Sequence, residues 1–158
     1  MNFTSPTKGQ LTFQQTFQDI ITYVDEKPKE QYKLIIGTDS QPHGNKDVCF
    51  VTAVIIHRLG KGARYYFHRL HKHYMSNLRQ RIYYETYLSL EVATMVTAKL
   101  VENGDSRLNV EIHLDVGEQG ETRDLIREVV GMVIGSGFPA FIKPDSYGAT
   151  KVADKYTK

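Results

Sequence analysis

The sequence predicts an α/β fold: a five-stranded mixed sheet with helices on both faces and one extra helix at the amino terminus. Apolar, strand-like runs alternate with segments of helical periodicity along the 158 residues. The longest helical segment lies between the third and fourth predicted strands and can serve as a right-handed crossover, which makes strands one and four parallel neighbours. We therefore expect the strand order 3-2-1-4-5, with the sheet reversing between strands one and four.

The first part of the chain is expected to hold an irregular arm, a helix and an antiparallel meander. Residues 1–10 are polar and contain a proline and a glycine, so we expect no regular structure there. Apolar residues at helical spacing predict a helix over residues 12–27, which Pro28 ends. Alternating and β-branched residues predict strands at 32–38, 48–57 and 64–74, separated by turn sequences that contain glycine.

The second half of the chain alternates helices and strands. A long helix is predicted from Leu78 to Glu102, with Asn77 as its cap and Asn103-Gly104 as its end. It is followed by a strand ending at Asp115, a helix over residues 122–134, a short strand over residues 138–142 and a helix over residues 147–156. The length fits a single domain over residues 1–158, with its core in residues 32–158.

The composition is that of an ordinary globular protein. It is 41% hydrophobic and 24% charged, and no apolar run approaches the ~20 residues that span a bilayer. The amino terminus lacks a charged segment followed by an apolar one, so we expect a cytoplasmic protein without a membrane partner. The single cysteine, Cys49, stands in a strand-like run and is expected to be a core residue rather than a nucleophile.

Two predicted strands from distant parts of the chain each lead into an aspartate. Asp39 follows the apolar run that ends at Gly37, and Asp115 follows the fourth strand. Ligands of open α/β sheets bind outside the carboxyl ends of strands at the point where the strand order reverses, so we expect one site shared by both residues. The alternative is that each aspartate starts a turn, a position that this residue favours.

Glu85 is a third candidate because it lies on the apolar face of the long helix. On a helical wheel of ~100° per residue, Leu88, Val92, Met95 and Val96 fall within roughly 80° of it. A carboxylate that packs on a sheet loses hydration and must be paired, protonated or bound to a metal. The alternative is that the first turns overhang the sheet edge, since acids are favoured at helix starts.

Positive charge is unevenly distributed, although the formal net charge is only +2. No acidic residue lies between Asp47 and Glu85, where basic residues and histidines are frequent. We expect this segment to contact nucleic-acid phosphates through Arg64, Arg69, Lys72 and Arg79, and to stack on bases through Tyr65, Tyr66, Phe67 and Tyr74. The alternative is a solvated hairpin whose basic side chains are unpaired.

The order of elements and acids resembles the ribonuclease H-like superfamily. The motifs that carry the resemblance are Gly37-Thr38-Asp39-Ser40, Arg81-Ile82-Tyr83-Tyr84-Glu85, His113-Leu114-Asp115 and Lys151-Val152-Ala153-Asp154. More narrowly, the chain resembles the uncharacterised bacterial YkuK-type family in three motifs: Ile36-Gly37-Thr38-Asp39-Ser40-Gln41, Ile142-Lys143-Pro144-Asp145-Ser146-Tyr147 and Val152-Ala153-Asp154. The resemblance covers residues 32–158.

The resemblance implies a metal-dependent nuclease that acts on nucleic acid of unspecified type. Nucleases of this superfamily hold two divalent ions with four acids, which here match Asp39, Glu85, Asp115 and Asp154. Hard oxygen ligands select Mg²⁺ or Mn²⁺, and we expect Asp39 to bridge both ions. Asp145 is an outer candidate because it stands in the loop where ribonucleases H often carry a histidine. No extension for binding an RNA:DNA hybrid is evident in the sequence.

Two other functions fit the same residues. The fold could bind nucleic acid or a protein partner without cutting, because a fold does not fix a function. His71 and His73 alternate on a predicted strand and so share a face, which is one way to begin a transition-metal site. Retention of all four acids favours the enzyme over the binding module.

Overall fold

The computed structural model describes residues 1–44, 46–75 and 77–158. Its strands are β1 (Asn2–Ser5), β2 (Gly9–Thr12), β3 (Tyr32–His43), β4 (Asp47–Arg58), β5 (Ala63–His73), β6 (Val110–His113) and β7 (Ala140–Phe141). Its helices are α1 (Phe13–Glu26), α2 (Leu78–Glu102), the 3₁₀ turn η1 (Arg123–Leu125), α3 (Ile126–Gly135) and α4 (Tyr147–Thr157). Within the described residues these strands form one sheet in the order β2-β1-β5-β4-β3-β6-β7.

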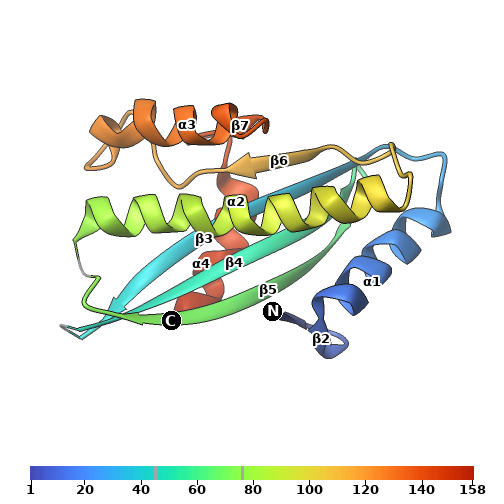
Figure 1. The fold of residues 1–158 in the computed structure, drawn as a ribbon, viewed down its shortest axis with the longest axis horizontal. Coiled ribbons are helices and arrows are strands. Elements are labelled where there is room, and N and C mark those ends of the chain that lie inside the picture. The colour runs from blue at the N-terminus through green and yellow to red at the C-terminus, as the bar shows by residue number, and fades with distance from the viewer. Residues whose placement is uncertain (45, 76) are drawn as a thin grey trace.

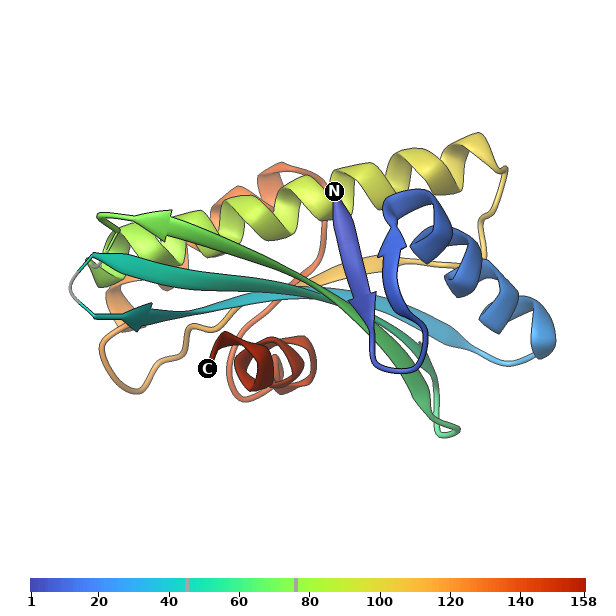
Figure 2. The ribbon, with the colours of Figure 1, turned by 90° about the horizontal axis from the view of Figure 1, so that it is seen from below.

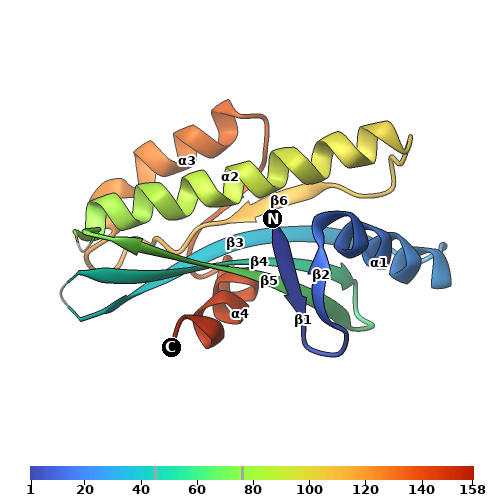
Figure 3. The ribbon, with the colours of Figure 1, turned by 60° about the horizontal axis from the view of Figure 1, so that its bottom comes forward.

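Helices cover both faces of this sheet (Figure 1). Helices α2 and α3 lie on one face and α4 crosses the other, as the view from below shows most clearly (Figure 2). Helix α1 packs beside α2 at the far end of the same face (Figure 3), and side chains of α1, α2 and α3 share one hydrophobic core. The predicted α/β architecture with helices on both faces is confirmed.

The predicted count of five strands is too low, because β1 and β2 extend the sheet to seven strands among the residues described. The five strands predicted from the sequence form the predicted order among themselves, here β5-β4-β3-β6-β7. Strand β3 pairs antiparallel with β4 and parallel with β6, so the sheet reverses between β3 and β6. Helix α2 is the crossover between the meander and β6, and its bounds are those predicted. The Asn77 side chain caps it by accepting a hydrogen bond from the backbone N–H of Gln80.

The prediction of an irregular arm over residues 1–10 is wrong. Strands β1 and β2 form a hairpin whose first strand pairs with the outer edge of β5, at Thr4 and Phe67. Phe3 is 1% exposed and belongs to the core, and Gly9 adopts the left-handed φ of +73° that the turn requires. Pairing with β5 and burial of Phe3 stabilise the hairpin, which covers a sheet edge that would otherwise be open.

Strand β3 is longer than the predicted residues 32–38. It continues to His43 because β4 pairs with it along its whole length, from Tyr32 with Arg58 to His43 with Asp47. Asp39 therefore lies inside a strand rather than at its end. The parallel ladder with β6 does stop nearby, at the pair of Gly37 with His113.

The last elements differ in detail from the prediction. The expected strand over residues 138–142 is reduced to β7, and the expected helix over residues 122–134 begins with the 3₁₀ turn η1 before α3. No helix within residues 1–44, 46–75 and 77–158 has the length and apolarity needed to cross a membrane.

Small residues let α4 lie close to β3. A Cβ added at Gly37 would come within 2.8 Å of the Ala149 Cβ, so only glycine fits there without a shift. On the opposite face, buried hydroxyl groups fix α2: the Thr38 Oγ1 lies 2.7 Å from the Ser89 Oγ and 2.9 Å from the Thr52 Oγ1. Both helices are therefore held in a defined register around the middle of β3.

Candidate metal centre

Three carboxylates converge beside the middle of β3. Asp39, Glu85 and Asp115 each offer an oxygen, and these oxygens all lie within 4.8 Å of one another. Asp39 is 9% exposed and Glu85 is 6% exposed, whereas the Asp115 side chain is 26% exposed. The three residues come from β3, α2 and the segment after β6, as the sequence predicted for a shared site.

The geometry of the sheet explains how acids from both faces meet. Strand β6 ends at His113, two residues before Asp115, while β3 runs on past Asp39. Beyond the end of the β3–β6 ladder the three carboxylate oxygens meet. Ser40 is on the α2 face of β3, like Thr38, and its Oγ donates a hydrogen bond of 2.5 Å to the Glu85 Oε2.

Burial and mutual repulsion favour the protonated forms of these acids. Burial, followed by the charge of Asp115, raises the pKa of Asp39 from 3.8 to about 8. Burial and then the charge of Asp39 raise the pKa of Glu85 well above its ordinary range, against the effect of the Ser40 hydrogen bond. Keeping the cluster ionised therefore costs folding free energy unless a cation is nearby.

Asp154 and Asp145 lie outside the three-carboxylate cluster. Asp154 is exposed on α4 and lines a cavity of about 570 Å³ together with Asp39 and Asp115. Its proximity also contributes to the raised pKa of Asp39. Asp145 is exposed in the turn before α4 and is not among the residues that line this cavity.

Lys143 is a residue of this site that sequence reasoning missed. Its Nζ lies 2.8 Å from the Asp115 Oδ1, and this hydrogen bond raises the pKa of the lysine. Its backbone N–H donates to the Val116 carbonyl, which continues the alignment of the chain after β7 with the chain after β6. A Cβ added at Gly117 would lie 3.0 Å from the Lys143 Cβ, so that glycine makes room for the lysine.

Arg81 is a second basic residue near the cluster. It lies one helical turn before Glu85 on α2, and its charge partly offsets the raised pKa of that acid. Its Nε is buried and has no hydrogen-bond partner among the described residues. A buried guanidinium N–H without a partner is available to a ligand.

The four basic residues expected to grip phosphates do not gather in one patch. Arg64 pairs with the Asp19 and Glu26 carboxylates of α1, at 3.6 Å each. Arg69 faces α4, where its guanidinium donates to the Tyr156 carbonyl at 2.9 and 3.1 Å. Arg64 and Arg69 lie on opposite faces of the sheet because even- and odd-numbered residues of β5 point in opposite directions.

The other two basic residues each lie against a tyrosine ring of α2. The Lys72 Nζ lies 5.6 Å from the centre of the Tyr84 ring, and the Arg79 guanidinium lies 5.4 Å from that of Tyr83. Arg79 also pairs with Glu128 of α3 at 3.0 Å.

The aromatic residues expected to stack on bases are mostly part of the core. Tyr66 is 1% exposed and Phe67 is 6% exposed, and Tyr65 bonds to the Tyr156 hydroxyl at 2.7 Å. Tyr74 is 76% exposed. Strand alternation turns the first three against helices, so this stacking role is not supported by their positions.

The histidine alternative also finds no support in the geometry. His73 bonds to Asp47 across the β4–β5 ladder, and His71 is exposed on the same face of β5. In the described part of the chain, the cluster of metal-ligand side chains that forms contains carboxylates and no histidine.

This fold and acidic centre define a ribonuclease H-like protein. The chain belongs to the ribonuclease H-like family, whose family model matches residues 15–158. A more specific relative is the uncharacterized protein YkuK of Bacillus subtilis (strain 168). It is 36% identical over 170 residues, which cover 99% of this chain and 96% of that protein. No solved structure matches the chain. The resemblance seen in the sequence motifs is confirmed.

Proposed function

We propose that the protein is a divalent-metal-dependent nuclease that hydrolyses phosphodiester bonds of nucleic acid by a two-metal mechanism. The observation that carries the proposal is the convergence of the Asp39, Glu85 and Asp115 carboxylates within 4.8 Å of one another. Burial and repulsion make this cluster costly, and a divalent cation removes that cost. Membership of the ribonuclease H-like family, which includes nucleases, supports the same function.

The donor set fits Mg²⁺ or Mn²⁺. All three groups are carboxylates, and hard oxygen ligands suit these ions better than zinc. The cavity of about 570 Å³ beside Asp39 and Asp115 gives room for hydrated ions and a phosphodiester. When bound, two such ions supply an activated attacking water and stabilise the charge on the leaving oxygen.

The residues of the chain have distinct proposed roles. Asp39 would be the ligand shared by both ions, because it lies in the three-carboxylate cluster, is more buried than Asp115 and also lines the cavity that Asp154 borders. Asp154 is the proposed fourth ligand from the cavity wall. The Ser40 hydroxyl fixes the Glu85 carboxylate through their hydrogen bond.

Two lysines complete the proposed substrate site. Lys143 and Lys151 line the same cavity as Asp39 and Asp115. A phosphodiester that enters this cavity meets their ammonium groups, and phosphate contacts of this kind supply most of the affinity of nucleic-acid-binding proteins.

Cleavage assays test the proposal directly. We expect purified protein to cut at least one of labelled single-stranded, duplex, hybrid and junction substrates in Mg²⁺ or Mn²⁺, and none of them in EDTA. Asp39→Asn and Glu85→Gln should abolish cleavage because each removes a ligand charge. Glu102→Gln is the matched control, because Glu102 is an exposed acid at the opposite end of the same helix.

Two results would contradict the nuclease. One is the absence of cleavage on every substrate in both metals, with calorimetry showing no Mn²⁺ binding. The other is cleavage that persists unchanged in Asp39→Asn, which would identify a contaminating nuclease.

One observation favours a second function, a binding module that does not cut. The Lys143 ammonium already neutralises Asp115 at 2.8 Å, which is one role of a metal ion. In a binding module, nucleic-acid affinity would be the same in EDTA and Mn²⁺, and Asp39→Asn would leave it intact or slightly tighter because it removes a negative charge near the phosphates.

A further inference from the structure

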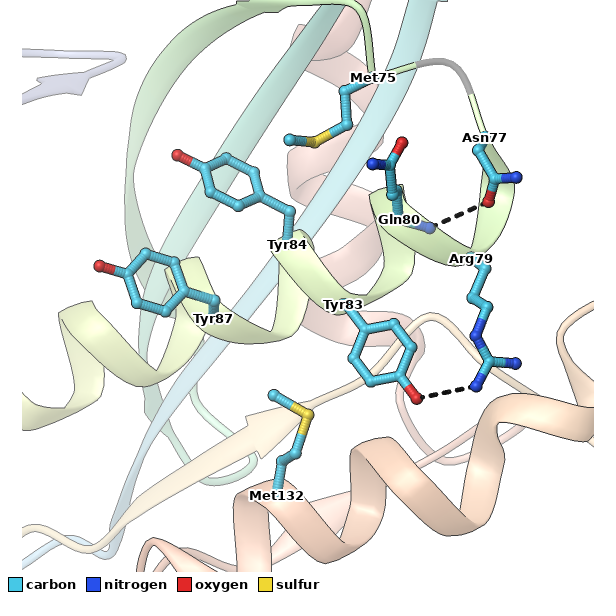
Figure 4. A pocket seen from close by; sticks show the side chains of 8 residues that line it. All are labelled: Met75, Asn77, Arg79, Gln80, Tyr83, Tyr84, Tyr87 and Met132. Carbon is cyan, nitrogen blue, oxygen red and sulfur yellow. Dashed lines mark hydrogen bonds between the residues drawn. The ribbon is translucent and has the colours of Figure 1, made fainter.

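A second cavity, of about 770 Å³, lies on the outward side of the first turns of α2. Three tyrosines form much of its wall, together with Met75 and with Met132 of α3. In Figure 4, Tyr84 and Tyr87 lie side by side, and Tyr83 and Met132 lie in front of the same part of the helix. We call this surface the tyrosine groove.

The rings in the groove have the geometry of a stacking platform. Those of Tyr84 and Tyr87 are 5.7 Å apart between centroids and inclined by 23°. Tyr84 is anchored from below by an edge contact with Phe50, at 4.9 Å and 77°. Tyr87 is 51% exposed, so its ring is accessible to a flat ligand.

The groove has cations against its rings and two carboxylates beside them. Lys72 and Arg79 lie over the Tyr84 and Tyr83 rings at 5.6 and 5.4 Å. Arg79 also pairs with Glu128 at 3.0 Å, and the Tyr87 hydroxyl donates a hydrogen bond of 3.1 Å to Glu91. Most of the wall comes from residues 75–84. These belong to the segment of residues 48–84, which contains no acidic residue. Flat ring faces beside fixed cations match a ligand that is both aromatic and anionic, as a nucleic-acid strand is.

The groove is close to the carboxylate centre along α2. Tyr84 directly precedes Glu85, and the two side chains project about 100° apart around the helix. A helix with its side chains is about 10–12 Å across. About three nucleotides of a stacked strand, at ~3.4 Å each, span this distance. Arg81 lies between the tyrosine groove and the carboxylate centre. It is on the Glu85 side of the helix, one turn nearer the start of α2.

We propose that the tyrosine groove binds unpaired bases of a single-stranded segment that flanks the phosphodiester held at the carboxylate centre. This proposal rests on the proposed nuclease and names its substrate class: single-stranded nucleic acid, or a duplex with a single-stranded extension. A blunt duplex does not use the groove, because its bases are already stacked on one another.

A second copy of this chain is a poorer occupant. A twofold interface would bury the same surface on both partners, so Lys72 and Arg79 would lose their hydration in both copies. Burying a charge costs free energy unless a new partner compensates for the lost water. The phosphates of an anionic strand supply such partners.

Binding measured by fluorescence anisotropy in EDTA tests the groove without cleavage. The probes are a labelled single-stranded 12-mer and a blunt duplex of the same length. We expect Tyr87→Ala to weaken binding of the single strand by about 5- to 150-fold, the range for losing one stacked base. Tyr87→Phe should retain the affinity, and duplex binding should be equal in all variants. Val101→Ala, an exposed apolar site at the other end of α2, is the matched control.

A direct readout of stacking is also available because the chain contains no tryptophan. Tyr87→Trp introduces a single indole whose emission should fall when the single strand is added and stay constant with the blunt duplex. Val101→Trp should show no change with either probe.

Two outcomes would overturn the groove proposal. One is single-strand affinity unchanged in both Tyr87→Ala and Tyr83→Ala, with no quenching of the indole. The other is a dimer in sedimentation experiments that Tyr87→Ala dissociates while single-strand affinity stays the same. Neither outcome bears on the proposed nuclease function, which is refuted separately if Asp39→Asn has no effect on cleavage.

Discussion

Replacing Asp39 by asparagine should stabilise the metal-free protein. The pKa of Asp39 is about 8 in the folded protein against an ordinary value of 3.8. The folded state therefore binds the proton more tightly than the unfolded chain, so its contribution to stability is fully present below about pH 4. It is lost as the pH rises through 8.

The size of the effect follows from the same values. Each pH unit between 3.8 and 7 lowers the free energy of unfolding by about 1.4 kcal/mol, which gives an upper limit of about 4 kcal/mol at pH 7. Asparagine removes the charge but still has a polar amide to desolvate, so the gain lies below this limit. For a chain of this length, 4 kcal/mol corresponds to a Tm rise of about 8–16 °C.

Thermal unfolding in EDTA across pH 5 to 8 measures the stabilisation expected for Asp39→Asn. The wild-type Tm should fall with rising pH, whereas that of Asp39→Asn should be higher at pH 7 and depend less on pH. Asp145→Asn is the control because Asp145 is exposed in the turn before α4. Mn²⁺ at 100 times its Kd should stabilise the wild type by about 2.7 kcal/mol and have little effect on Asp39→Asn.

A folded Asp39→Asn protein that is less stable than the wild type in EDTA at pH 7 would refute this reasoning. So would a Tm response to Mn²⁺ that is equal in the two proteins. The first result would mean that the cluster is not strained by its own charge, and the second that the ion binds elsewhere.

Three further predictions test individual contacts. Ser40→Ala removes the hydroxyl bond that orients Glu85 and should lower Mn²⁺ affinity, measured by calorimetry, about 10- to 100-fold; an unchanged affinity would exclude the positioning role. Lys143→Met removes the ammonium group that competes with a metal ion for Asp115, so Mn²⁺ should bind more tightly. Binding of single strands in EDTA should weaken, and weaker Mn²⁺ binding would show that Lys143 does not compete with the ion. Gly37→Ala forces a methyl group against α4 and should lower the free energy of unfolding in urea by about 1–3 kcal/mol, whereas full stability would show that the helix can shift.

The central part of the fold could be predicted because each element there has a strong local signal. Helix α2 begins at an asparagine cap and ends before Asn103-Gly104, and its predicted bounds match the structure. The amino-terminal hairpin could not be predicted in this way. Its strands are four residues each and mostly polar, and they are ordered by pairing with the β5 edge and by burial of Phe3.

The acids of the candidate centre could be proposed from the sequence because the end of an apolar strand-like run and the position of a residue on a helical wheel are local properties. Asp39 and Asp115 each lie two residues beyond the last pair of the parallel β3–β6 ladder, and Glu85 offers an oxygen to the same cluster from α2. The position of Lys143 depends on contacts with residues that are distant in the sequence. Its place is set by a hydrogen bond to Val116 and by the space that Gly117 leaves, neither of which has a pattern in the chain.

The aromatic residues show why nearness in sequence is a poor guide to a binding surface. Tyr66 and Phe67 stand among basic residues, yet β5 has a helical layer against each face and buries both rings. Helix α2 has only one face against the sheet, so consecutive turns place Tyr83 and Tyr87 on the side that the sheet does not cover. A stacking surface in this fold therefore belongs on the outward side of α2, where the aromatic rings remain accessible and where Lys72 and Arg79 lie over the faces of Tyr84 and Tyr83.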